Sequence, residues 1–163
     1  MKEKILLLDL EGVCINDWFE GRFLLPDNLE KIAKFARDEQ TKEVCKLQFG
    51  LMSWAVQGSI DLSIFERTLR EHIELLIDQS FDDDKLWTMR WWTSELFRTC
   101  GTHVELGELS GFYKKLDLLV KIAPVSESLA GREVILIDDH VPNVKVEFPD
   151  SNTMIRTVNI ARL

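Results

Sequence analysis

Two acidic residues, Asp9 and Glu11, end the first apolar run of the chain and begin the short sequence DLEGV. Gly12 follows them and allows the backbone to turn sharply. Asp9 could attack a phosphorus atom as a nucleophile, and Glu11 could protonate the leaving oxygen and later activate water. On these residues alone, a structural role for Asp9 at a strand end and a solvated Glu11 explain the segment equally well.

A second pair of acids, Asp138 and Asp139, closes the apolar run VILIDD. Adjacent carboxylates repel each other, and burial makes the repulsion worse. A bound divalent cation would relieve it, and Mg²⁺ prefers oxygen ligands, commonly one or two carboxylates plus water and substrate phosphate. A plain polar turn after a strand is the alternative for this segment.

The elements that carry these acids are predicted to be strands. Residues 4–10 and 133–139 are continuous apolar runs, which are typical of parallel strands covered on both faces. Ligands of open parallel sheets bind at the carboxyl ends of strands. Neighbouring parallel strands would therefore bring all four acids to one crevice. Residues 153–160 predict a further, closing strand, whereas residues 116–125 fit a strand or a helix.

The middle of the chain, residues 18–100, is predicted to be mainly helical. A helix is expected to begin at Pro26, before apolar residues at helical spacing. Asp61 resembles the N-cap of another helix, since apolar residues follow it at steps of three and four. The acids 82–84 are expected to open a third helix that carries Trp87, Trp91 and Trp92. We expect the tryptophans to pack one helix against others rather than to line a pocket.

The amino-acid composition limits the classes of function that the protein can have. The 163 residues fit one domain, or a core with one small insertion, and 45% of them are hydrophobic. The formal net charge of −8 disfavours nucleic-acid backbones and anionic membranes as partners. No apolar stretch approaches the length of a membrane span. Three separated cysteines predict reduced thiols rather than disulfides, so we expect a cytoplasmic protein.

At both ends the chain resembles the haloacid dehalogenase superfamily. KILLLDLEGV is similar to its first signature, hhhhDxDG(T/V), with Glu11 in the place of the second acid. VILIDDHVPNV resembles its fourth signature, and GSIDLSIFERTLREHIEL is similar to the helical cap that many members insert. The resemblance implies an α/β fold in which residues 1–15 and 101–163 form a parallel-sheet, Rossmann-like core. Residues 16–100 would then be a helical cap inserted after the first strand.

The resemblance also implies a chemistry, the hydrolysis of small phosphomonoesters through a phosphorylated Asp9. Glu11 would assist hydrolysis and would offer its backbone carbonyl to Mg²⁺ beside Asp9. Asp139 would contact the metal directly, with Asp138 in support. The family uses two further groups, a Ser or Thr after a hydrophobic strand and a Lys. Ser126 and Lys121 are the candidates for them.

The lysine is the weakest part of this assignment. Lys121 falls inside a predicted strand or helix, and Lys114 and Lys115 are expected to be solvated. Only residues 127–133 separate Ser126 from the last acidic strand, which leaves little room for the usual intervening elements. A non-catalytic or weakly active relative that serves as a binding or regulatory protein is therefore the alternative to a phosphatase.

Overall fold

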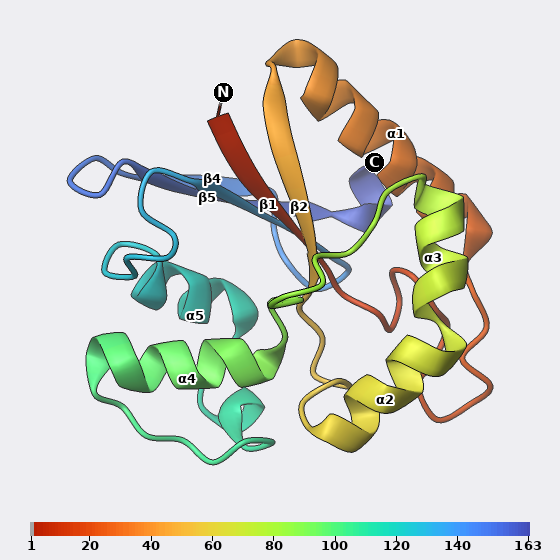
Figure 1. Cartoon of the computed structure of the whole chain (residues 1–163), viewed down its shortest axis with the longest axis horizontal. Helices are drawn as coiled ribbons and strands as arrows, with labels where there is room; N and C mark the ends of the chain where they lie inside the picture. Colours follow the sequence, from red (N-terminus) through yellow and green to blue (C-terminus); the bar gives the residue numbers. More distant parts are fainter. Residues whose placement is uncertain (1) are drawn as a thin grey trace.

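A sheet of five strands forms the centre of the computed structural model, which describes residues 2–163 (Figure 1). The order of the strands in the sheet is β2-β1-β3-β5-β4. The first four of these run parallel, and β4 pairs antiparallel with β5 at one edge. Their bounds are β1 Lys2–Leu8, β2 Cys45–Leu51, β3 Glu133–Asp138, β4 Val144–Phe148 and β5 Thr153–Asn159. The predicted parallel pairing of the two acid-bearing strands is confirmed, with Leu8 opposite Ile137.

Helices cover both faces of this sheet, which makes three layers. Alternate residues of β1 point to opposite faces because side chains of a strand alternate. Leu6 and Leu8 join a cluster with α1, α2 and α3, whereas Ile5 and Leu7 join a cluster with α4 and α5. The helices are α1 Pro26–Lys42, α2 Ser59–Thr68, α3 Arg70–Ile77, α4 Met89–Cys100 and α5 Lys115–Ile122. Short 3₁₀ turns lie at Leu109–Gly111 and Ile160–Arg162.

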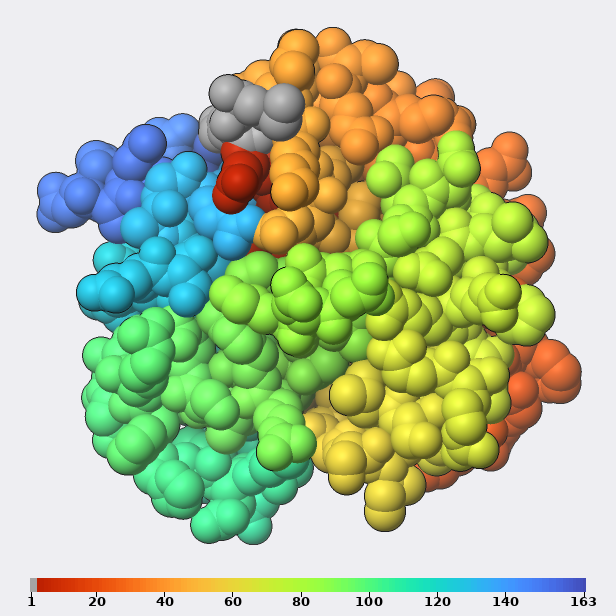
Figure 2. All heavy atoms as spheres, viewed as in Figure 1, coloured from red at the N-terminus to blue at the C-terminus, as the bar shows by residue number. Residues whose placement is uncertain are grey.

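The two helical groups lie on either side of the strands in Figure 1, with α1, α2 and α3 together and α4 beside α5. In the space-filling view the segments of α2, α3 and α4 spread over the face toward the reader (Figure 2). Only the start of β1 shows there as a small red patch. From Lys4 to Leu8 strand β1 is buried, as the continuous apolar sequence of residues 5–8 predicts.

The middle of the chain differs from the helical prediction at one element. Residues 45–51 form β2, which pairs with β1 along its whole length. The carboxyl-terminal half of β2 is buried, but its first residues are partly exposed. Its sequence therefore lacks the continuous apolar pattern found in β1 and β3. This part of the segment 16–100 belongs to the central sheet and not to a helical insertion. The division of the chain into core and cap stays a prediction.

Several element boundaries also need correction. The ambiguous stretch 116–125 is helical, because α5 covers most of it. Helix α1 begins at Pro26 as predicted. Asp61 is not the N-cap but the third residue of α2, and its carboxylate accepts a bond from the backbone N–H of Gly58, the residue at the N-cap. Helix α4 begins at Met89, after the acids 82–84 and after Trp87, whose φ of 56° is left-handed.

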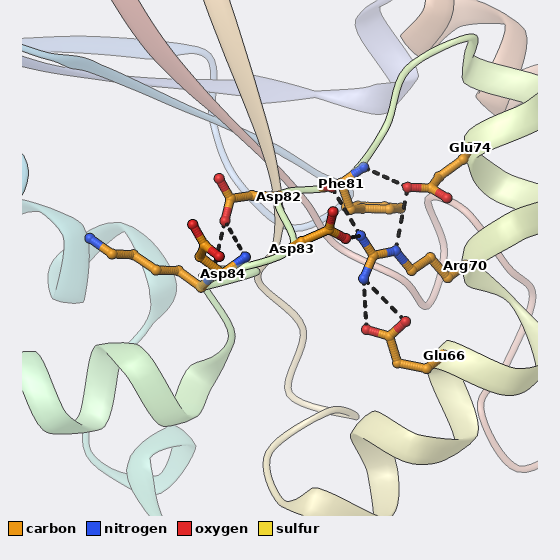
Figure 3. A network of polar contacts seen from close by, with 8 residues as sticks. Glu66, Arg70, Glu74, Phe81, Asp82, Asp83 and Asp84 are labelled. Carbon is orange, nitrogen blue, oxygen red and sulfur yellow. Dashed lines mark hydrogen bonds and ion pairs between the residues drawn. The ribbon is translucent and has the colours of Figure 1, made fainter.

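An extended segment covers the edge of β2 beside these acids. The backbone N–H of Asp82 donates to the carbonyl of Phe49, and the N–H of Leu51 donates to the carbonyl of Leu86. Arg70 holds the start of this segment, since its guanidinium donates to the carbonyl of Phe81 at 2.9 Å. Figure 3 shows the same guanidinium directed at Glu66, Glu74 and Asp83. These contacts tie α2 and α3 to the protected sheet edge.

A second ion network lies at the amino-terminal end of β1, away from the acids. Lys4 Nζ lies 3.0 Å from Glu39 Oε2 and 3.2 Å from Glu133 Oε2, and all three side chains are buried. Arg156 of β5 forms an ion pair with the other oxygen of Glu39. Hydrogen bonds from Arg156 and Lys4 outweigh the effect of burial on Glu39 and lower the pKa of that carboxyl. The network joins α1 to three neighbouring strands.

Candidate active site

Three carboxylates meet at the carboxyl end of the two central strands. Asp9 follows β1 directly, and its backbone N–H donates to the carbonyl of Ile137 at 3.1 Å. Asp138 ends β3, and Asp139 follows it. One oxygen of each carboxylate lies within 4.8 Å of one oxygen of the other two. The predicted convergence of Asp9, Asp138 and Asp139 is confirmed.

A lysine that we expected to be solvated lies beside two of these carboxylates. Lys115, the first residue of α5, is only 6% exposed. Its Nζ lies 2.9 Å from Asp9 Oδ1 and 2.6 Å from Asp138 Oδ2. A lysine is rarely buried without a charged partner, and here two carboxylates supply one. The expectation for Lys115 was wrong because its partners come from strands far away in the sequence.

The remaining oxygens of the acid pair differ in their partners. Asp138 Oδ1 accepts a bond from the backbone N–H of His140 at 2.7 Å, so both of its oxygens are engaged. Asp139 Oδ2 lies 3.4 Å from His140 Nε2. Asp139 Oδ1 is buried and has no hydrogen-bond partner. An unpaired buried carboxylate oxygen is costly, so this atom is the one best suited to bind a cation.

Gly12 makes room for Asp139. Its φ is +80°, a conformation that favours glycine. A Cβ at this position would lie 2.1 Å from Asp139 Oδ2 and 2.7 Å from Asp139 Cγ. The glycine of DLEGV therefore permits both the turn and the close approach of a carboxylate from the neighbouring strand.

Burial dominates the electrostatics of Asp9. Loss of solvent raises the pKa of its carboxyl to about 7, and the negative charges of Asp138 and Asp139 act in the same direction. The ammonium of Lys115 opposes that rise. Burial also raises the pKa of the neighbouring Cys14 thiol well above its ordinary value. With one cation among three carboxylates, the cluster keeps excess negative charge when all three are ionised, and this charge favours a bound divalent ion.

Glu11 is not part of the carboxylate cluster. Its side chain is half-buried, and Glu11 Oε2 accepts a bond from the backbone N–H of Trp18 at 3.1 Å. The carboxylate thus closes the loop after β1. Its roles as acid, base and metal-site residue stay predictions.

The two further candidates, Ser126 and Lys121, are not brought together with Asp9. Ser126 lies beyond the other end of α5 from Lys115, and its buried hydroxyl donates to Glu95. Lys121 is exposed, near the end of α5. Neither residue lines the pocket described below. Their placement gives no support to a catalytic role.

Ser53 is a hydroxyl that sequence reasoning missed. It follows β2 by two residues, is 1% exposed, and its Oγ accepts a bond from the backbone N–H of Ala55. The backbone N–H of Met52 donates to the carbonyl of Leu8, so Ser53 lies at the same end of the sheet as Asp9. The only signal was the sequence LQFGLMS, a mostly apolar stretch interrupted by Gln48 that ends in a serine. Once β2 is recognised, Ser53 precedes Lys115 and the acid pair in the chain.

A pocket of about 680 Å³ opens beside the cluster. Its volume is within the range of small-molecule sites. Asp9, Asp138 and Lys115 are the buried charged residues of its lining. The other lining residues are Trp54, Ser110, Tyr113, Lys114, Leu116, Asp117, His140, Val141 and Pro142. The arrangement can hold a divalent cation at the carboxylates and an anionic ligand beside Lys115.

No protein-family model, characterised protein or solved structure matches this chain. Within residues 2–163, none of the helices combines the length and the apolar character needed to cross a bilayer.

Proposed function

We propose that the protein is a Mg²⁺-dependent phosphatase of small phosphomonoesters that works through a phosphorylated aspartate. The observation that carries this proposal is the position of Asp9 beside Lys115 at the end of a pocket. A carboxylate nucleophile, an adjacent cation and neighbouring carboxylates are what phosphoryl transfer through an aspartyl phosphate needs. The resemblance of DLEGV and VILIDD to signatures of the haloacid dehalogenase superfamily supports the same chemistry.

The donor set fits Mg²⁺. Asp9 and Asp139 would hold the ion through carboxylate oxygens, together with the backbone carbonyl of Glu11, while Asp138 would orient Lys115. The unpartnered, buried Asp139 Oδ1 supports a direct bond from that residue. Bound there, the ion would neutralise the carboxylates and stabilise negative charge on the transferred phosphoryl group.

In the proposed reaction Asp9, Glu11 and Lys115 would each have a separate role. An oxygen of Asp9 attacks phosphorus, a bond forms between them, and the bond to the leaving oxygen breaks. Glu11 gives that oxygen a proton and then takes a proton from the water that attacks phosphorus and releases Asp9. Lys115, which lines the pocket, stabilises charge on the phosphoryl oxygens throughout. The reaction yields an alcohol and inorganic phosphate.

A non-catalytic binding protein was the alternative, because the sequence offered no suitable lysine. The ion pairs of Lys115 with Asp9 and Asp138 remove that argument. The spacing argument depends on Ser126, and the structure places Ser126 away from Asp9, bonded to Glu95. We therefore favour the enzyme.

Phosphate release from 4-nitrophenyl phosphate tests the proposal. Turnover should require Mg²⁺, stop with a chelator and fall to background in Asp9→Asn. Asp150→Asn changes an exposed aspartate of the β4–β5 turn and serves as the matched control, with unchanged turnover. Full activity in Asp9→Asn, or no Mg²⁺-dependent turnover in the wild type across several phosphomonoesters, would overturn the proposed function.

A further inference from the structure

Two aromatic side chains, Trp54 and Tyr113, line the pocket that holds Asp9 and Lys115. Trp54 follows β2 in the loop that leads to α2, and Tyr113 precedes α5 by two residues. Both are half-buried and pack against the hydrophobic cluster under α4 and α5. Each ring therefore has packed neighbours that limit its movement, and a surface that still faces the pocket.

The rest of the wall is mixed, and it includes the polar residues Ser110 and His140. Leu116, Val141 and Pro142 line the pocket, and Lys114 and Asp117 carry opposite charges at exposed positions. A phosphoryl group beside Lys115 would fill only part of the pocket of about 680 Å³, so space is left for the organic part of a substrate. The opposed charges give no preference for a second anionic or cationic group.

We infer that the substrate is a phosphomonoester whose alcohol carries a flat aromatic or heteroaromatic ring, which packs against Trp54 and Tyr113. This inference rests on the proposed phosphatase function and names its substrate class. Aromatic pairs contribute favourable energy beyond the burial of their area. Binding of a part of the substrate distant from phosphorus can also raise the rate, because it fixes the phosphoryl group next to Asp9.

Three esters of primary alcohols separate ring recognition from leaving-group reactivity. Benzyl phosphate presents a flat ring, cyclohexylmethyl phosphate a puckered apolar ring of similar size, and glycerol 3-phosphate no ring. We expect kcat/KM for benzyl phosphate to exceed that of cyclohexylmethyl phosphate by about tenfold, and that of glycerol 3-phosphate by more. Equal values for the benzyl and cyclohexylmethyl esters would overturn the inference.

Substitutions locate the ring site. Trp54→Leu and Tyr113→Leu should each lower the benzyl-to-glycerol ratio of kcat/KM by about fivefold to tenfold, whereas Tyr113→Phe keeps the ring and the ratio. Phe112→Leu is the matched control, because Phe112 is exposed beside Tyr113 and does not line this pocket. An unchanged ratio in both leucine variants would overturn the assignment. If neither variant folds, the comparison of the three esters in the wild type decides.

Direct binding keeps the two proposals apart. Benzylphosphonate and methylphosphonate cannot be hydrolysed, and their Kd values are measured by calorimetry with the wild type in Mg²⁺. Benzylphosphonate should bind about tenfold more tightly. Turnover of the esters without any ring preference leaves the phosphatase intact and overturns the ring site. Tighter binding of benzylphosphonate without turnover of any ester keeps the ring site and overturns the phosphatase. If no ester is hydrolysed and benzylphosphonate does not bind more tightly than methylphosphonate, both proposals are overturned.

Discussion

The ammonium of Lys115 lies 2.9 Å from Asp9 Oδ1, and both side chains are buried. The pair joins the start of α5 to the end of β1, and Asp138 of β3 completes it at 2.6 Å from the same nitrogen. Because burial of an unpaired charge is expensive, each member of this group depends on the others. The chemistry proposed for Asp9 and the stability of this end of the sheet are therefore linked.

Removal of the Lys115 ammonium by substitution should show this link. Lys115→Met keeps much of the side-chain volume but leaves Asp9 and Asp138 without a cationic partner. We expect the free energy of unfolding in Mg²⁺-free buffer to fall by about 3–5 kcal/mol, with part of the loss recovered in Mg²⁺. Phosphatase turnover should fall by about 10²–10³-fold.

Urea unfolding measures the stability effect, and Lys121→Met is the matched control. Lys121 lies on the same helix but is exposed, so its loss should change the free energy of unfolding by less than about 0.5 kcal/mol. Equal effects of the two substitutions would contradict a role for the buried ion pairs.

The carboxylate cluster should respond to Mg²⁺ even without substrate. At a hundredfold excess over its Kd, Mg²⁺ should raise the free energy of unfolding by about 2.7 kcal/mol, provided that the unfolded chain does not bind it. Asp139→Asn removes one negative charge and one metal ligand. It should stabilise the metal-free protein slightly and lose most of the Mg²⁺-dependent rise in Tm.

Thermal unfolding with and without Mg²⁺ checks both effects of Asp139→Asn. Asp150→Asn, which removes a charge in an exposed turn, should keep the full rise. A wild type that shows no shift at millimolar Mg²⁺, together with an Asp139→Asn variant that is only destabilised, would mean that the cluster is purely structural.

Two of the glycines with positive φ, Gly12 and Gly101, separate the effect of backbone strain from that of steric conflict. Gly12→Ala places a Cβ against the carboxylate of Asp139, whereas a Cβ at Gly101 has nothing within 4 Å. Both substitutions incur left-handed strain, so Gly101→Ala should cost about 1 kcal/mol. Gly12→Ala should cost about 2–3 kcal/mol and also abolish the Mg²⁺-dependent rise in Tm, because it displaces Asp139. If both variants kept that rise, the contact between Gly12 and Asp139 would be irrelevant to metal binding.

The ion network at the opposite end of β1 predicts a pH dependence of stability. The pKa of Glu39 is lower in the folded protein than its ordinary value, so its ionised form contributes stability that is full above about pH 4.3. That contribution is lost as the pH falls below this value toward the folded-state pKa. Glu39→Gln should cost about 3 kcal/mol at pH 7, because it leaves Lys4 and Arg156 with less negative charge.

Urea unfolding at pH 7 and near pH 3 checks this prediction. The difference between Glu39→Gln and the wild type should shrink at the lower pH. Glu30→Gln, at an exposed position on the same helix, should match the wild type at both values. A constant difference between Glu39→Gln and the wild type would show that packing, and not ionisation, accounts for the effect.

The sequence by itself determined the elements whose signals are local. Residues 5–8 of β1 and 134–137 of β3 are buried on both faces and are all apolar, so the acids that follow them stand out. Helix α1 was predictable from Pro26 and the apolar spacing after it. Parallel pairing of β1 with β3 then brought Asp9, Asp138 and Asp139 together, because the carboxyl ends of adjacent parallel strands share one edge of the sheet.

Tertiary structure decided what depends on partners distant in the chain. Strand β2 has only β1 as a strand neighbour and is partly exposed, so its sequence mixes polar and apolar residues, and Ser53 after it was overlooked. Nothing around Lys115 in the sequence distinguishes it from Lys114, which is exposed. Lys115 is buried because α5 packs with its first residue beside two carboxylates, and this Coulomb attraction exists only once the strands and the helix have assembled.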